Sequence, residues 1–86
     1  MNFENYAAQG SITTELWENV LRTIYEAAIK TSDGYIMSVS LGIRSDLRSQ
    51  VCQQLQFQGY ITKVKLLGQD KIQCQVTEKI YRYFEQ

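Results

Sequence analysis

The sequence predicts one α+β domain built from about three amphipathic helices and a β-hairpin. Apolar residues recur at helical spacing over residues 13–30, 45–58 and 77–85. Between residues 62 and 76 they alternate with polar residues on both sides of a Gly-Gln-Asp turn. With 86 residues, of which 44% are apolar and 12% aromatic, the chain is long enough for a single modest core. We therefore expect residues 1–86 to form a single domain with an N-terminal arm over residues 1–11.

The first helix is expected from Thr13 to about Lys30. Thr13 is a suitable N-cap, and Ile12 before it can pack against Trp17 as a hydrophobic staple. The apolar positions form a wide stripe, typical of a helix that packs on more than one neighbour: Leu16, Trp17, Val20, Leu21, Ile24, Tyr25 and Ala28. The turn 32–34 (Ser-Asp-Gly) then ends the helix.

Residues 35–40 allow two interpretations. The run is short and contains β-branched residues, so a short third strand and a single irregular turn both fit it.

The central helix is expected to begin at Ser45 and to end before Gly59, which suits the C′ position. One of its faces is apolar: Leu47, Val51, Cys52 and Leu55. Arg48 lies near this face, so either its long side chain reaches solvent at the helix edge or the helix begins in a different register. The opposite face carries short polar and amide side chains: Asp46, Ser49, Gln50, Gln53 and Gln56. Because these side chains gain little from burial, this face is available to a partner.

The C-terminal half predicts an antiparallel hairpin that turns at Gly68–Asp70 and leads into a last helix. Ile72, Cys74 and Val76 should face inward, because a one-residue slip of register would expose all three. Thr77 can cap the last helix, in which Ile80 and Phe84 share a face.

Charge and cysteine usage narrow the possible functions. The net charge is zero, which argues against binding nucleic acid by charge alone. Residues 1–43 hold two basic residues against five acidic ones, and residues 44–86 hold seven against four, so either a basic face or ordinary scatter fits the distribution. Cys52 and Cys74 lie on expected apolar faces and should be buried, reduced thiols.

Several classes of protein find no support in the sequence. The N-terminus does not resemble a secretory signal and no segment approaches membrane-spanning length, so the expected compartment is the cytoplasm. Without histidine, a zinc site lacks conventional ligands, and no cofactor is expected. Glu15 and Glu18 are three residues apart, which is typical of a solvated helix face rather than of an acid–base pair. We therefore expect a protein that is not an enzyme.

The order helix, extended segment, helix, hairpin, helix resembles a winged helix-turn-helix domain over residues 13–85. Leu41–Ile43 before the central helix and Gly59–Ile61 after it resemble the turn and the exit of such domains. Val76–Lys79 resembles their passage from the second wing strand into a closing helix, with Ile80 where the family has glycine. There is little room for the second helix usual in the family. Small bacterial and prophage proteins of this kind consist of the domain alone.

The resemblance implies a DNA-binding transcriptional regulator, expected to act on double-stranded DNA as a homodimer. The candidate DNA contacts lie on the central helix and the hairpin: Arg44, Ser45, Ser49, Gln50, Gln53, Lys63, Lys65 and Lys71. Glutamine can pair with adenine, serine can reach a phosphate or a base edge, and lysines suit phosphates. Against this, Asp46 would repel phosphate, and lysine on an edge strand also guards against aggregation.

The alternative is a protein-interaction module that does not bind DNA, a role in which winged helices also occur. The chain has more aromatic residues than one small core needs, and aromatic residues are enriched at protein–protein interfaces. The expected dimer interface consists of Trp17, Tyr25, Tyr81 and Phe84. Phe57 lies on the polar side of the central helix, unless it folds under the hairpin.

Overall fold

The computed structural model describes residues 13–68 and 70–85, which form an α+β fold as predicted. The expected N-terminal arm and the proposed staple residue Ile12 lie outside the described residues. In chain order the elements are α2 (Thr14–Ala28), β1 (Tyr35–Ser40), α3 (Ser45–Phe57), β2 (Ile61–Leu66), β3 (Lys71–Val76) and α4 (Glu78–Glu85). None of the described helices is both long and apolar enough to cross a membrane.

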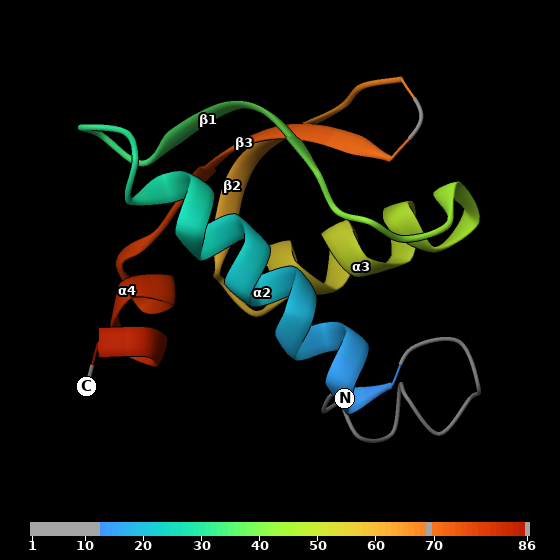
Figure 1. Cartoon of the computed structure of the whole chain (residues 1–86), viewed down its shortest axis with the longest axis horizontal. Coiled ribbons are helices and arrows are strands. Elements are labelled where there is room, and N and C mark those ends of the chain that lie inside the picture. Colours follow the sequence, from blue (N-terminus) through green and yellow to red (C-terminus); the bar gives the residue numbers. More distant parts are fainter. Residues whose placement is uncertain (1–12, 69, 86) are drawn as a thin grey trace.

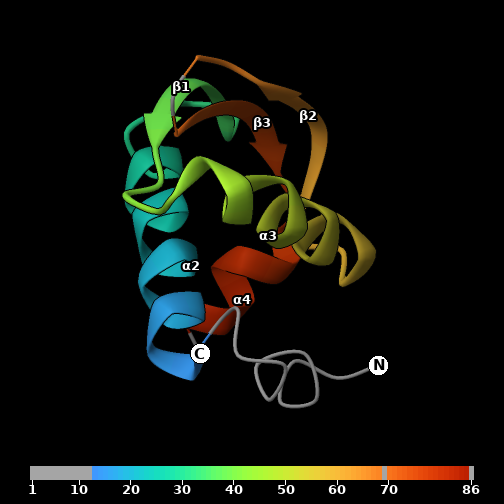
Figure 2. The same cartoon turned by 90° about the vertical axis from the view of Figure 1, so that its right-hand side faces the viewer.

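The elements form two layers. The strands make one antiparallel sheet in the order β1-β3-β2, and the helices lie together on one side of it (Figures 1 and 2). The core fills the space between the layers. Its largest fully buried side chains come from the three helices and β3: Val20, Leu21, Ile24, Val51, Leu55, Ile72, Cys74 and Ile80. The strands β1 and β2 add the buried side chains of Ile36 and Ile61. The hairpin therefore rests on helices that come both before and after it in the chain.

Helix α2 begins at the predicted cap and ends two residues earlier than predicted. The Thr13 Oγ1 atom accepts a hydrogen bond from the Leu16 amide at 3.0 Å. At the other end, the Thr31 hydroxyl donates to the Ala28 carbonyl at 2.9 Å and accepts from the Gly34 amide at 2.8 Å. Lys30 thus lies beyond the helix, because the Thr31 side chain closes the last turn.

Residues 35–40 form a strand, which decides between the two interpretations of this run. Ile36 pairs with Cys74 and Val39 with Ile72, so β1 holds one more residue than β3 between these pairs. Such a bulge reverses the alternation of side chains. Ile36 is buried and Val39 packs against the core, whereas Met37 between them is 68% exposed.

The connection 41–44 between β1 and α3 contains no helix and is held by the hairpin turn. The Asp70 carboxylate accepts hydrogen bonds from the Ser40 hydroxyl at 2.7 Å and from the Gly42 amide at 2.9 Å. These bonds, that of Ser40 above all, lower the pKa of Asp70. The Leu41 side chain is buried in the core. The turn of the hairpin thereby fixes the point at which α3 begins.

Helix α3 ends in the glycine motif that the sequence predicts. Gly59 has a left-handed φ of +83°. Its amide bonds the Gln56 carbonyl at 3.0 Å, and the Tyr60 amide bonds the Leu55 carbonyl at 2.9 Å. This pair of bonds is a Schellman motif, and the buried side chains of Tyr60 and Leu55 give it the usual apolar support. The motif directs the chain from α3 into β2.

The hairpin and the last helix also follow the prediction. Ile61 pairs with Val76 and Leu66 with Ile72, with an irregularity between Thr62 and Lys65. The three residues predicted to face inward, Ile72, Cys74 and Val76, are buried. Thr77 precedes α4, and its hydroxyl donates to the carbonyls of Gly59 and Tyr60, which joins the start of α4 to the end of α3.

Both cysteines should resist thiol reagents in the folded protein. Cys52 and Cys74 are unbridged and buried, as predicted, and burial raises the pKa of Cys52 to about 11 and that of Cys74 to about 12. Since the thiolate is the reactive form, we expect slow labelling by a thiol-reactive dye near neutral pH and rapid labelling of both residues once denaturant unfolds the chain. Fast labelling of both thiols under native conditions would contradict this burial.

Candidate nucleic-acid interface

The polar face of α3 is exposed and forms one continuous stripe. Gln53 lies at its centre, because the residues three and four positions away on either side are all exposed: Ser49, Gln50, Gln56 and Phe57. Residues at these spacings are neighbours on a helix surface. The stripe therefore presents amides and a hydroxyl side by side, with Asp46 one turn before Ser49.

An ion pair occupies the N-terminal end of this stripe. The Arg44 Nε donates to Asp46 Oδ1 at 3.0 Å, and its Nη2 contacts the other carboxylate oxygen. The pair raises the pKa of Arg44 and lowers that of Asp46. It also offsets the negative charge that Asp46 would otherwise direct at a phosphate. Ser45 opens α3, but its side chain is not among those the structure describes.

Arg48 joins α3 to the hairpin, a role that the sequence did not predict. Its Nη1 donates to the carbonyls of Leu67 and Lys71, the latter at 3.2 Å. These two carbonyls flank the hairpin turn, and the Leu67 amide bonds the Lys71 carbonyl at 3.0 Å. The guanidinium thus binds backbone instead of extending into solvent. The signal in the sequence was a cation at the border of an apolar helix face, which needs a polar partner nearby.

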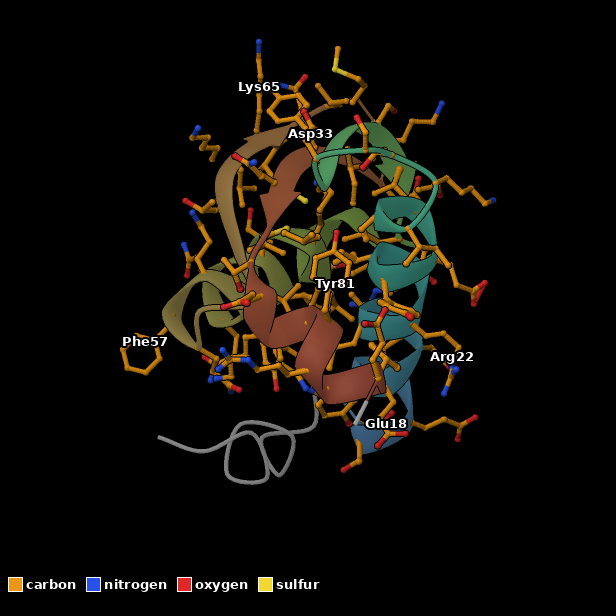
Figure 3. The ribbon with its side chains drawn as sticks, turned by 90° about the vertical axis from the view of Figure 1, so that its left-hand side faces the viewer. Glu18, Arg22, Asp33, Phe57, Lys65 and Tyr81 are labelled. Atoms are coloured by element: carbon orange, nitrogen blue, oxygen red, sulfur yellow. The ribbon has the colours of Figure 1, made fainter. Side chains whose placement is uncertain are left out.

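The three hairpin lysines are exposed beside α3, but they do not lie on its stripe. Lys65 pairs in register with Gln73, and its side chain points away from the helical layer (Figure 3). Lys63 lies in the irregular part of β2 with a φ of +55°. Lys71 is next to Asp70 and helps to lower the pKa of that carboxyl. Lys63 and Lys65 are therefore better placed than Lys71 to offer charge to a partner.

Three of the four residues expected at a dimer interface, Tyr25, Tyr81 and Phe84, come together within one chain. The rings of Tyr25 and Phe84 stack with centroids 4.6 Å apart, and Tyr81 meets Tyr25 edge-on at 6.2 Å. The Tyr25 hydroxyl donates to the Glu85 carboxylate at 2.8 Å. Trp17 is only 6% exposed. The rings of Tyr25, Tyr81 and Phe84 thus pack α2 against α4, and the homodimer remains a prediction.

Phe57 is the most exposed aromatic side chain among the described residues. It is 77% exposed and projects from the C-terminal end of α3 (Figure 3). The interpretation in which it folds under the hairpin is therefore wrong.

Comparisons of the chain with protein-family models, with curated proteins and with solved structures found no match. Among the described residues there is neither a pocket nor a group of three or more side chains placed to hold a metal ion. The functional argument consequently depends on the residues themselves.

Proposed function

We propose that the chain is a small DNA-binding regulator of the winged-helix type. The element order and the sheet order β1-β3-β2 support this, because α3 immediately precedes the hairpin and the two are joined through Arg48. In this proposal α3 is the recognition helix and the β2-β3 hairpin is the wing. The short connection 41–44 takes the place of the helix that usually supports the recognition helix.

The exposed stripe centred on Gln53 is the observation that carries the proposal. An α-helix fits the major groove of B-DNA, where amide and hydroxyl side chains can bond base edges. Lysines on the wing would then contact phosphates, which position the protein without reading sequence. Of the residues proposed from the sequence, Ser49, Gln50 and Gln53 are exposed on α3, and Lys63 and Lys65 lie on the strand that follows it.

We further propose a cytoplasmic homodimer. A single domain with no net charge would bind DNA weakly, and a second copy raises the effective concentration of the second helix. Sedimentation of the wild-type chain tests the dimer directly. A substitution at Phe84 would not, because its ring stacks on Tyr25 within the chain and a loss of packing would resemble a loss of assembly.

Replacing Lys65 by alanine should weaken DNA binding several-fold and reduce its dependence on salt. If the ammonium contacts one phosphate, the slope of log affinity against log salt should fall by about 0.9. Fluorescence anisotropy with a labelled duplex measures both quantities. The control is Lys30→Ala, which removes the same charge from an exposed position beyond α2. Equal effects of the two substitutions would mean that only net charge matters and that β2 is not the wing.

The exposure of Phe57 favours a second candidate, a protein-interaction module. A solvated aromatic ring beside a polar helix face is the composition expected at the centre of a protein–protein interface. The two candidates separate in one measurement. If wild-type protein gives no anisotropy change with any duplex at low salt, DNA binding is excluded and the protein partner becomes the better proposal.

A further inference from the structure

The cationic side chains of α3 and its N-terminal flank already have partners within the chain. Guanine is read in the major groove mainly by arginine or lysine, which donate to its O6 and N7 atoms. Helix α3 contains no lysine. Arg48 donates to two hairpin carbonyls, and Arg44 is paired with Asp46. Both arginines that could read guanine therefore already have partners within the chain, Arg48 on backbone carbonyls and Arg44 on an exposed carboxylate.

The acidic side chain of the stripe is committed in the same way. A carboxylate can accept a hydrogen bond from the N4 amino group of cytosine. Both Asp46 oxygens, however, contact the Arg44 guanidinium, which also lowers the pKa of Asp46. The pairing of Arg44 with Asp46 thus competes with guanine for the guanidinium and with cytosine for the carboxylate.

The centre of the stripe is an amide. Gln53 is exposed, and its neighbours along the helix surface are exposed as well. Base edges in a DNA major groove could therefore reach its side chain without obstruction. The glutamine amide offers a donor NH2 group and an acceptor oxygen, which match the N7 acceptor and the N6 donor of adenine. Ser49, one turn earlier, can bond either kind of base pair and so does not oppose this preference.

We propose that α3 recognises A·T base pairs and that Gln53 makes the central contact with adenine. This inference rests on the proposed DNA binding. It names the class of DNA that the same helix would select, with an A·T pair at the centre of the segment that each α3 covers.

Selection from a duplex library in which the whole binding site is randomised tests the preference on the full chain. We expect the enriched sequences to share an A·T pair at the centre of each segment that α3 covers. Replacing that adenine by 7-deazaadenine removes the N7 acceptor and leaves base pairing intact, and it should weaken wild-type binding about tenfold. The Gln53→Ala variant should bind the two duplexes equally. Since Gln53 is exposed and alanine favours helix, this variant should fold, which circular dichroism can check.

A matched control removes the same amide elsewhere. Gln75 lies on β3 opposite Thr62, between the buried residues Cys74 and Val76, so its side chain points to the other face of the sheet. Gln75→Ala should therefore keep the sensitivity to 7-deazaadenine. A central G·C pair, or sensitivity that persists in Gln53→Ala, would overturn the A·T assignment while leaving DNA binding intact. The absence of any enriched or bound duplex would overturn both proposals.

Discussion

Replacing Gly34 by alanine is expected to destabilise the fold by about 3 kcal/mol, as the sum of backbone strain and overpacking. Gly34 has a φ of +74°, a left-handed conformation that costs an alanine roughly 1–2 kcal/mol. An added Cβ would also lie 2.9 Å from Val76 Cγ2 and 3.0 Å from the Tyr81 hydroxyl oxygen. Overpacking of this kind typically costs about 1–3 kcal/mol.

The turn cannot easily move to relieve this contact. The Gly34 carbonyl accepts from the Val76 amide at 3.0 Å, and the Gly34 amide donates to the Thr31 hydroxyl oxygen at 2.8 Å. Moving the backbone away from Val76 and Tyr81 would break the bonds that join the end of α2 to the sheet. The substitution should therefore lower the melting temperature rather than shift the turn.

Two other glycines provide matched controls for the Gly34 substitution. Gly42 also has a positive φ, but no atom lies within 4 Å of an added Cβ, so Gly42→Ala should cost only the backbone strain, about 1 kcal/mol. Gly68 has neither feature, and Gly68→Ala should stay within about 0.5 kcal/mol of wild type. Thermal and denaturant unfolding rank the three variants. If Gly34→Ala were as stable as Gly42→Ala, the contact of the added Cβ with Val76 and Tyr81 would not destabilise the fold.

The features that could be predicted depend on residues close together in sequence. Thr13 caps α2 through an amide three residues away, and Gly59 closes α3 through bonds to residues three to five positions apart. The hairpin has an alternating pattern and a short turn, both of which are local signals. The exposure of the α3 stripe follows from periodicity in the same way, so the polar part of the candidate site was also predictable.

The features that could not be predicted depend on partners far apart in sequence. The bulges in β1 and β2 arise only when both strands pair with β3. Arg48 finds its carbonyl partners 19 and 23 residues away, and Asp70 fixes the chain near Ser40, 30 residues away. Counting aromatic residues overestimated the free apolar surface, because α4 folds back onto α2 and stacks Phe84 on Tyr25.

Replacing Arg48 by methionine is expected to destabilise the fold by about 2 kcal/mol and to loosen the hairpin turn. Hydrogen bonds from a charged donor contribute roughly 1.5–3 kcal/mol, and the substitution leaves the carbonyls of Leu67 and Lys71 without this donor. Methionine keeps the apolar stem of the side chain, so most of the packing along α3 should be preserved. The loss of stability should therefore reflect the missing guanidinium rather than a cavity in the core.

The control for Arg48→Met is Arg44→Met, which removes a guanidinium from an exposed ion pair with Asp46. Such pairs contribute about 0–1 kcal/mol, so this variant should unfold close to wild type. Hydrogen exchange at the Leu67 amide, which bonds the Lys71 carbonyl across the turn, should become faster in Arg48→Met and stay unchanged in Arg44→Met. Because the proposed wing depends on this turn for its position beside α3, Arg48→Met should also weaken the proposed DNA binding without removing any residue of the exposed stripe. Unchanged exchange at Leu67 in both variants would show that the hairpin holds its turn without α3.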